Sequence, residues 1–278
     1  MISSESFVLG TAQAKAGYGI TRKSQQDQYA FRTLLTTANQ LGISWLDTAQ
    51  NYGEAEQWIG DAPGFNFKVS SKVALRGTDI DTLKKSVEKS IRALGAERLQ
   101  VVFAHDWETA SVLEQKAFIE LKKEFPHLKL GLSIYDPQTL EILLNSLDII
   151  SLFQVPLNLL NQSFIALISK CKSYGIETWA RSIFLQGVLD YRLENNPFSQ
   201  HNDIKRFQTF CHKHDLSPIE AAISFVINTE VNMRIFGVDN SDQLRELYRL
   251  YNLNHSEVDF RELASTDQDL IDPRRWKR

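Results

Sequence analysis

The chain has 278 residues, 43% hydrophobic and 23% charged, so it can bury a full core either as one large barrel or as two ordinary domains. A formal net charge of −3 and a pI near 6.1 exclude a general attraction for nucleic acid, and the basic tail at residues 274–278 is too short to reverse this. The two cysteines, Cys171 and Cys211, form no C-x-x-C pair and stand near no histidine cluster, so neither a disulfide framework nor a metal site is expected.

The sequence predicts a cytoplasmic protein that does not enter a membrane. Its first residues, MISSESFVLG, lack a basic region followed by an apolar stretch. The most apolar region, residues 140–160, is interrupted by Glu141, Asn145, Asp148 and Asn158, which a membrane-spanning helix would not tolerate. Nothing in the sequence specifies an oligomeric state.

Short β-branched and apolar runs alternate along the chain with longer stretches of helical period, such as residues 79–94. Eight runs are strand candidates: residues 7–11, 43–47, 67–72, 99–104, 128–133, 149–154, 176–180 and 232–237. Eight βα units in roughly 250 residues match the size of a (β/α)8 TIM barrel. We therefore predict a single α/β domain over residues 1–278, with a loop at 181–200 and an extension at 254–278 that overhang the barrel mouth.

Polar side chains gather at the predicted carboxyl ends of the strands, where a barrel of this kind builds its chemistry. They are Gln13, Asp47, Lys72, His105, Ser133, Gln154 and Arg181. Any one of them alone is best explained as a solvated residue at the start of a loop. Three ionisable groups of complementary type at consecutive strand ends, Asp47, Lys72 and His105, indicate a catalytic centre instead.

One segment carries a specific pattern. GISWLDTAQNYGEAEQWIG, residues 42–60, places Asp47 at the end of a strand and Tyr52 on the loop that follows. The pattern D-T-A-x-x-Y-G-x-x-E, followed by the strand-end Lys72 and His105, resembles the aldo-keto reductases. The resemblance extends from LGTAQ (residues 9–13) through QVPLN (154–158) to a turn near Gly237. It implies NADP(H)-dependent reduction of an aldehyde or ketone to an alcohol, with Asp47, Tyr52, Lys72 and His105 as the catalytic group.

The chemistry of carbonyl reduction independently requires these residue types. Hydride addition builds negative charge on the carbonyl oxygen, so a positioned acid must donate a proton. Lys72, within hydrogen-bonding distance, would lower the pKa of Tyr52 from its usual value near 10, and Asp47 would hold Lys72 in place. His105 would orient the carbonyl or share the proton with Tyr52. Each residue also has a structural explanation, such as Asp47 as a helix N-cap, but the four together favour catalysis.

The sequence contains no G-x-G-x-x-G motif, and its nearest match at residues 17–19 lacks the third glycine, so a Rossmann domain is not expected. The resembling family instead lays an extended NADP(H) across the barrel mouth. The resemblance assigns Ser133 and Gln154 to the carboxamide, Arg181 to stacking on the nicotinamide ring, and Ser182 with residues 183–189 to the pyrophosphate. Gln154 fits a strand-end cap equally well. Ile134 replaces an asparagine common in the family, which removes one amide contact.

After the eighth strand, the family often holds the adenosine 2′-phosphate through a lysine just after the strand and an arginine and an asparagine in the next helix. The matching residues here are Gly237, Gln243 and Leu247, so both cationic contacts are missing. Backbone amides around Asn240 could still bind a phosphate at a helix N-terminus, although Asp239 or Asp242 as the cap would repel one placed too close. We predict that NADPH is preferred over NADH, but less strongly than a Lys/Arg pair would allow, with NAD(H) as the alternative.

Loop aromatics are the expected walls of the substrate pocket: Tyr18, Trp107 and Phe184. Trp276 in the tail fits the pocket and the outer face of the barrel equally well. Two other functions stay open. One is a cofactor-binding regulatory subunit that acts through protein contacts, and the other is a non-redox lyase or isomerase that uses Tyr52 and Lys72 for proton transfer.

Overall fold

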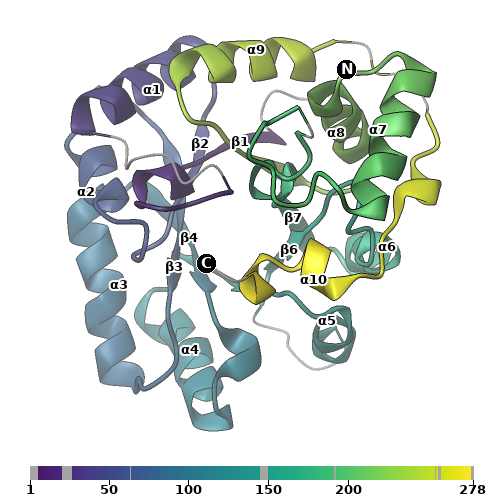
Figure 1. The fold of residues 1–278 in the computed structure, drawn as a ribbon. Coiled ribbons are helices and arrows are strands. Elements are labelled where there is room, and N and C mark those ends of the chain that lie inside the picture. Colours follow the sequence, from purple (N-terminus) through teal and green to yellow (C-terminus); the bar gives the residue numbers. More distant parts are fainter. Residues whose placement is uncertain are drawn as a thin grey trace.

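The computed structural model describes residues 6–20, 27–62, 64–144, 150–190, 192–253, 255 and 258–276. Eight parallel strands pair in sequence order, and the last pairs with the first to close a barrel. Helices surround this barrel on its outer face (Figure 1). The predicted (β/α)8 TIM barrel is confirmed.

The strands lie close to their predicted positions. They are β1 Phe7–Gly10, β2 Trp45–Asp47, β3 Lys68–Val73, β4 Leu99–Ala104, β5 Lys129–Ser133, β6 Leu152–Pro156, β7 Glu177–Arg181 and β8 Met233–Gly237. The largest shift is in β6, which was predicted at residues 149–154. Gln154 therefore lies inside a strand rather than at its end.

The helices are α1 Gln28–Gln40, α2 Ala55–Gly60, α3 Ile80–Leu94, α4 Val112–Glu124, α5 Pro137–Leu143, α6 Ile165–Ser173, α7 Asn202–His214, α8 Pro218–Ile227, α9 Ser241–Tyr251 and α10 Gln268–Ile271. Most of the helices begin at a side-chain cap, and α2 and α6 are the exceptions among those described. Capping boxes start α4 at Ser111 and α8 at Ser217. Both α7 and α8 lie between β7 and β8, so this connection is longer than the others.

Alternate residues of each strand point into the barrel, and their polarity changes along its axis. One interior layer is an apolar cluster of Val8, Val101, Phe103, Leu152, Trp179 and Ile235. Trp179 packs edge-on against Trp45, with ring centroids 5.1 Å apart. Two residues further along these strands stand Arg181 and Asp47. The barrel thus has an apolar floor below a polar layer at its carboxyl end.

The long loop and the C-terminal segment are joined to each other. Trp276 packs on Phe198 of the loop, with centroids 5.1 Å apart, its indole N–H donates to the carbonyl of Leu270 at 3.2 Å, and it does not line the cavity. His201 at the start of α7 is 3.0 Å from Asp267. Residues 191, 254, 256, 257, 277 and 278 of these two predicted segments lie outside the described residues. Within the described ranges, no helix has both the length and the apolar character needed to cross a membrane.

Candidate active site

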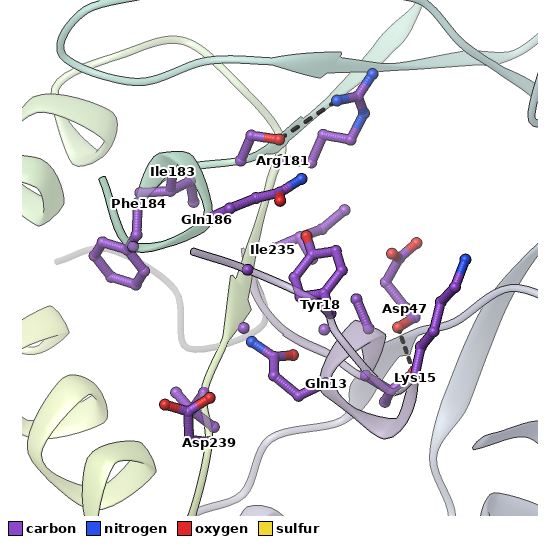
Figure 2. Close-up of a pocket in the computed structure, with 18 of the residues that line it drawn as sticks. Gln13, Lys15, Tyr18, Asp47, Arg181, Ile183, Phe184, Gln186, Ile235 and Asp239 are labelled. Atoms are coloured by element: carbon purple, nitrogen blue, oxygen red, sulfur yellow. Dashed lines mark hydrogen bonds between the residues drawn. The ribbon is translucent and has the colours of Figure 1, made fainter. Parts of the chain in front are cut away.

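A cavity of about 530 Å³ opens at the carboxyl end of the barrel. Asp47, Tyr52, Lys72 and His105 all line it, so the structure brings the four predicted catalytic residues together. Much of its remaining wall comes from the loops after β1 and β7 and from the start of α9 (Figure 2).

A buried ion pair forms one side of the site. Lys72 Nζ donates to Asp47 Oδ2 at 2.6 Å and to the carbonyl of Thr48 at 2.9 Å. Asp47 Oδ1 accepts two more hydrogen bonds of 2.8 Å, from Ser70 Oγ and Gln154 Nε2. Burial lowers the pKa of Lys72, and Asp47 opposes this by stabilising the ammonium. Because Gln154 on β6 reaches Asp47 on β2, both side chains lie inside the barrel.

Two side chains of the D-T-A-x-x-Y-G-x-x-E segment fix the loop that carries Tyr52. Gln50 Nε2 donates to the carbonyl of Ser86 on α3 at 2.8 Å. Glu56 Oε1 accepts from Ser71 Oγ on β3 at 2.6 Å, and both residues are buried. The glutamate of the motif therefore has a structural role: it holds the loop that places Tyr52 at the cavity.

Tyr52 lies near both Lys72 and His105. Lys72 Nζ is 5.3 Å from the centre of the Tyr52 ring, and the His105 ring stands edge-on to it at a centroid distance of 6.5 Å. The hydrogen bonds of the described residues include none between Tyr52 and Lys72. Burial raises the pKa of Tyr52 well above 10, and the charge of Asp47 raises it further.

The predicted lowering of the Tyr52 pKa by Lys72 is thus wrong for the protein without ligands. Asp47 compensates the charge of Lys72 at 2.6 Å, while burial disfavours the phenolate. Tyr52 is consequently protonated at neutral pH, which is the form that a proton donor needs.

His105 is held directly after β4, where its backbone N–H donates to the carbonyl of Val73 at 2.9 Å. Burial lowers the pKa of His105 to about 3, and the charges of Lys72, Arg181 and Lys15 add to this effect. The imidazole is therefore neutral at physiological pH and can donate one N–H hydrogen bond.

We expect His105 to keep the NMR signals of its neutral form between pH 8 and pH 5, because its pKa lies near 3. Its folded-state pKa lies below the ordinary value, so this group stabilises the fold above about pH 6.5 and loses that contribution as pH falls toward 3. A titration of ¹⁵N-histidine-labelled protein measures this, with His105→Asn identifying the signal. A midpoint between pH 6 and 7 would contradict the assignment.

Most of the side chains assigned to the cofactor by resemblance line the cavity, namely Ser133, Gln154, Arg181, Ser182, Gly237 and Gln243. Gln154 donates to Asp47, but its Oε1 is buried and has no hydrogen-bond partner among the described residues. Such an oxygen is costly unless a donor reaches it, and an incoming carboxamide N–H₂ would supply one. At Gly237 a Cβ would lie 2.4 Å from Gln13 Nε2, so glycine keeps this part of the wall open. These features fit a nicotinamide cofactor.

The loop after β7 has a strained backbone. Ser182, Leu185 and Gln186 have φ angles of 58°, 47° and 53°, in the left-handed region that non-glycine residues rarely adopt. The Asn158 side chain donates to the carbonyl of Ser182 at 3.1 Å, and the Ile20 N–H donates to that of Gln186 at 3.1 Å. Strain of this kind persists where contacts hold it and concentrates at ligand sites, which suits the predicted pyrophosphate contact.

Trp107 does not line the cavity, so its prediction as a substrate contact is wrong. Directly after His105 the chain turns into a 3₁₀ helix, Trp107–Thr109. This turn buries Trp107, 4% exposed, against Phe118 of α4. Tyr18 and Phe184 do line the cavity, as predicted.

The helix that follows β8 is capped by Asn240 rather than by Asp239 or Asp242. Asn240 Oδ1 accepts from the N–H of Gln243 at 2.9 Å, so its side chain is used for capping and does not line the cavity. The Gln243 side chain folds back as well, and its Oε1 accepts from the N–H of Asp239 at 2.8 Å. Neither side chain points freely toward a ligand.

This end of the cavity is acidic. Asp239 and Glu246 line it. Arg245, one turn into α9, donates instead to Gln40 Oε1 at 3.2 Å and to Thr37 Oγ1 at 3.4 Å on α1, away from the cavity. No lysine or arginine of α9 is among the described residues that line the cavity.

Tyr135 is a cavity residue that the sequence interpretation missed. The guanidinium carbons of Arg181 and Arg274 each lie 3.8 Å from the centre of its ring. Two guanidinium groups cannot share one face at this distance, so they cover opposite faces of the ring. The only sequence signal was an aromatic residue two positions beyond the strand-end Ser133, and neither arginine is near it in the chain.

Solved structures share this fold, among them an aldo-keto reductase and a glycerol dehydrogenase. An aldo-keto reductase of Bacillus halodurans superposes with a TM-score of 0.75, at 18% identity and over 93% of this chain and 90% of that one. The glycerol dehydrogenase of Gluconobacter oxydans gives a TM-score of 0.71, at 18% identity and over 92% and 93% of the two chains. At these identities the likeness concerns the fold alone.

The sequence comparisons are more specific. An uncharacterized oxidoreductase of Schizosaccharomyces pombe is 32% identical over 229 residues, which cover 73% of this chain and 79% of that protein. An aryl-alcohol dehydrogenase of Pestalotiopsis microspora is 30% identical over 102 residues, only 30% of this chain and 27% of that protein. The model of the aldo/keto reductase family matches residues 6–268. The chain therefore belongs to the aldo/keto reductase family and is an oxidoreductase.

Proposed function

We propose that this protein reduces an aldehyde or ketone to the alcohol with a nicotinamide cofactor, using Tyr52 as the proton donor. The observation that carries the proposal is the convergence of Tyr52, neutral His105 and the Lys72–Asp47 pair on one cavity. The cofactor, when bound, supplies the hydride that adds to the carbonyl carbon. The buried, unpartnered Oε1 of Gln154 supports a carboxamide contact in the same cavity.

The side chains have complementary roles in this proposal. Tyr52 is protonated and donates its hydroxyl proton to the substrate oxygen as negative charge forms there. Nearby cations reduce the cost of the phenolate left behind: Arg181 lowers the pKa of Tyr52, and Lys72 Nζ lies 5.3 Å from its ring. Neutral His105 donates a hydrogen bond to the same substrate oxygen and orients it. Asp47 keeps Lys72 charged and in place.

The remaining cavity residues divide between the two ligands. We assign Ser133 and Gln154 to the carboxamide, Arg181 to the nicotinamide ring, and Ser182 to the pyrophosphate. Gly237 and Gln243 belong to the adenosine end, and Tyr18 and Phe184 to the substrate wall. The complete catalytic group favours an enzyme over a subunit that acts only by protein contact, and the carboxamide acceptor favours redox chemistry over a lyase or isomerase.

A screen of aldehydes and ketones with NADPH and NADH, followed by cofactor absorbance, tests the proposal. We expect cofactor oxidation with several members of the panel, and alcohol formation in equal amount. If the folded protein oxidises neither cofactor with any of these carbonyl compounds, the proposed function is wrong.

We expect NADPH to be preferred over NADH by less than about tenfold in kcat/KM. The helix N-terminus favours a 2′-phosphate, but Asp239 and Glu246 line this end of the cavity and repel it. Gln243→Arg should raise the NADPH/NADH ratio about tenfold, since hydrogen bonds to charged groups contribute about 1.5–3 kcal/mol. The measurement is kcat/KM for both cofactors with one carbonyl, together with their Kd values from fluorescence.

Arg245→Gln is the matched control, because Arg245 bonds to α1 rather than facing the cavity. It should leave the ratio unchanged. A ratio that falls in Arg245→Gln, or that does not respond to Gln243→Arg, would show that α9 does not bind the phosphate as described.

A further inference from the structure

We propose that the carbonyl substrate carries an anionic group, a carboxylate in its simplest form, and that Arg181 binds this group inside the cavity. The inference rests on the proposed reductase function and specifies its substrate class. It comes from the charge distribution of the cavity and from the way Arg181 is held.

No carboxylate of the described residues pairs with the positive charge of Arg181. Its guanidinium donates to the carbonyl of Ile134 at 3.3 Å and to Ser182 Oγ at 3.4 Å, both long hydrogen bonds to neutral oxygens. Among the ion pairs of the described residues, none includes Arg181, although the side chain is partly buried. A guanidinium has five N–H donors, so it retains both its charge and free donor capacity for a planar carboxylate.

The orientation of this guanidinium is set before any ligand arrives. One face of Arg181 packs on the Tyr135 ring at 3.8 Å, and Arg274 covers the other face of that ring. Arg274 is itself neutralised by Asp272 at 2.7 Å and Glu108 at 3.2 Å. The C-terminal segment thus fixes Tyr135, and Tyr135 fixes Arg181. A rigidly held donor loses little entropy when it binds its partner.

Glu108 completes this support from the other side. Its Oε1 accepts from the N–H groups of Tyr135 at 2.7 Å and Asp136 at 2.6 Å, while its Oε2 accepts from Arg274 at 3.2 Å. The carboxylates of Glu108 and Asp272 therefore bind Arg274 and the backbone of the loop after β5. They do not pair with Arg181, which lines the cavity.

Arg181 lies in the part of the cavity where the substrate carbonyl is proposed to react. It shares the cavity with Tyr52 and His105, and its charge lowers the pKa of both. Lys15, an exposed residue after β1, lines the same cavity, also lowers the pKa of His105, and has no ion pair among the described residues. The catalytic end of the cavity therefore holds two uncompensated positive charges.

None of the acidic residues that line the cavity pairs with Arg181 or Lys15 among the described ion pairs: Asp47 pairs with Lys72 at 2.6 Å, and Asp190 pairs with Arg192 at 2.8 Å. Asp239 and Glu246 line the end near α9, and Figure 2 shows Asp239 on the opposite side of the cavity from Arg181 and Lys15. The reduced nicotinamide ring is uncharged, so the cofactor offers no anion at the catalytic end. An anion that pairs with Arg181 would therefore come from the substrate. The N–H edge of Arg181 would bind it, and the face not covered by Tyr135 stays open to the nicotinamide.

Matched substrate pairs test this inference. We would compare 4-formylbenzoate with its neutral methyl ester, and 4-oxobutanoate with its methyl ester, because each pair has the same carbonyl. Wild-type kcat/KM should favour the anion by about tenfold or more, as expected for a charge-assisted hydrogen bond. In Arg181→Gln this ratio should fall about tenfold, and Lys15→Gln should lower it less. Arg92→Gln removes a charge from the exposed, distant surface of α3 and should leave the ratio unchanged.

The ratio of kcat/KM for the anion to kcat/KM for its ester distinguishes anion binding from other effects of Arg181. Loss of cofactor affinity or of phenolate stabilisation lowers turnover of both members equally, and an unchanged ratio in Arg181→Gln would overturn the inference. So would equal wild-type efficiencies for both pairs. Calorimetric binding of 4-(hydroxymethyl)benzoate reports the same contact without turnover: affinity that falls about tenfold in Arg181→Gln supports the anion site even if reduction is not observed, whereas absent or unchanged binding contradicts it.

Discussion

Tyr52→Phe is expected to lower kcat by on the order of 10²–10⁴-fold while leaving the Kd of NADPH close to the wild-type value. The substitution removes the hydroxyl that is proposed to donate the proton but keeps the ring near Lys72 and His105. Because the Tyr52 hydroxyl makes no hydrogen bond among those of the described residues, its loss should not disturb the fold. Steady-state kinetics and cofactor fluorescence measure the two effects.

Tyr174→Phe is the matched control, since Tyr174 is 56% exposed and lies at the end of α6, outside the cavity. It should keep wild-type kcat. A primary isotope effect from deuterated cofactor establishes whether chemistry limits the rate. If chemistry is limiting and Tyr52→Phe still turns over like the wild type, Tyr52 is not the proton donor.

Lys72→Met should be at least as damaging to kcat and should also destabilise the fold by about 3–5 kcal/mol, as found when one partner of a buried ion pair is removed. Lys72 is 2% exposed and Asp47 is 4% exposed, so little solvent reaches the carboxylate left behind. Ser70 and Gln154 would still donate to Asp47, but its uncompensated charge would raise the pKa of Tyr52 further. Chemical denaturation and kcat provide the two measurements.

The double variant Lys72→Met with Asp47→Asn separates the structural effect from the catalytic one. It removes both charges, so it should recover much of the lost stability without recovering kcat. Wild-type stability in Lys72→Met alone would contradict the importance of the buried pair for the fold. A double variant that regained turnover would show that Lys72 is not needed for the chemistry.

The barrel could be predicted from the sequence because most of its strands are short apolar or β-branched runs that alternate with stretches of helical period. The prediction was least accurate at β6, where apolar residues continue on both sides of the strand and mark no boundary. The candidate catalytic group could be predicted because Asp47 and Tyr52 stand in the specific D-T-A-x-x-Y-G-x-x-E pattern, and Lys72 and His105 stand at the ends of the next two strands. Parallel strands then bring their carboxyl ends together.

Other features of the site depend on contacts between residues that are distant in the chain. Trp107 follows His105 directly, but a 3₁₀ turn directs it into the core, and single-sequence reasoning does not reveal such a turn. The Arg181–Tyr135–Arg274 stack joins β7, the loop after β5 and the C-terminal segment. The expected cap of the helix after β8 was Asp239 or Asp242, but the structure uses Asn240, because the position of the cap is decided by the backbone geometry.

The pKa of Tyr52 could not be predicted from the residue types alone. The sequence supplies a lysine next to a tyrosine, which alone would lower the pKa of the tyrosine. In the structure Asp47 lies 2.6 Å from that lysine, and burial of Tyr52 outweighs the remaining attraction. The pKa of Tyr52 therefore depends on its burial and on its distances from Asp47 and Lys72. The residue types alone do not specify these distances.

Deuteride transfer is the most direct test of carbonyl reduction at this site. Wild-type protein would be incubated with nicotinamide-4-deuterated NADPH, prepared as each of the two C4 epimers, and a carbonyl compound from the screen, and the product analysed by mass spectrometry. We predict an alcohol with one deuterium on the former carbonyl carbon from one epimer only, and its loss in Tyr52→Phe. An alcohol without deuterium from either epimer, or a product formed without cofactor oxidation, would contradict hydride transfer and favour a non-redox reaction in this cavity.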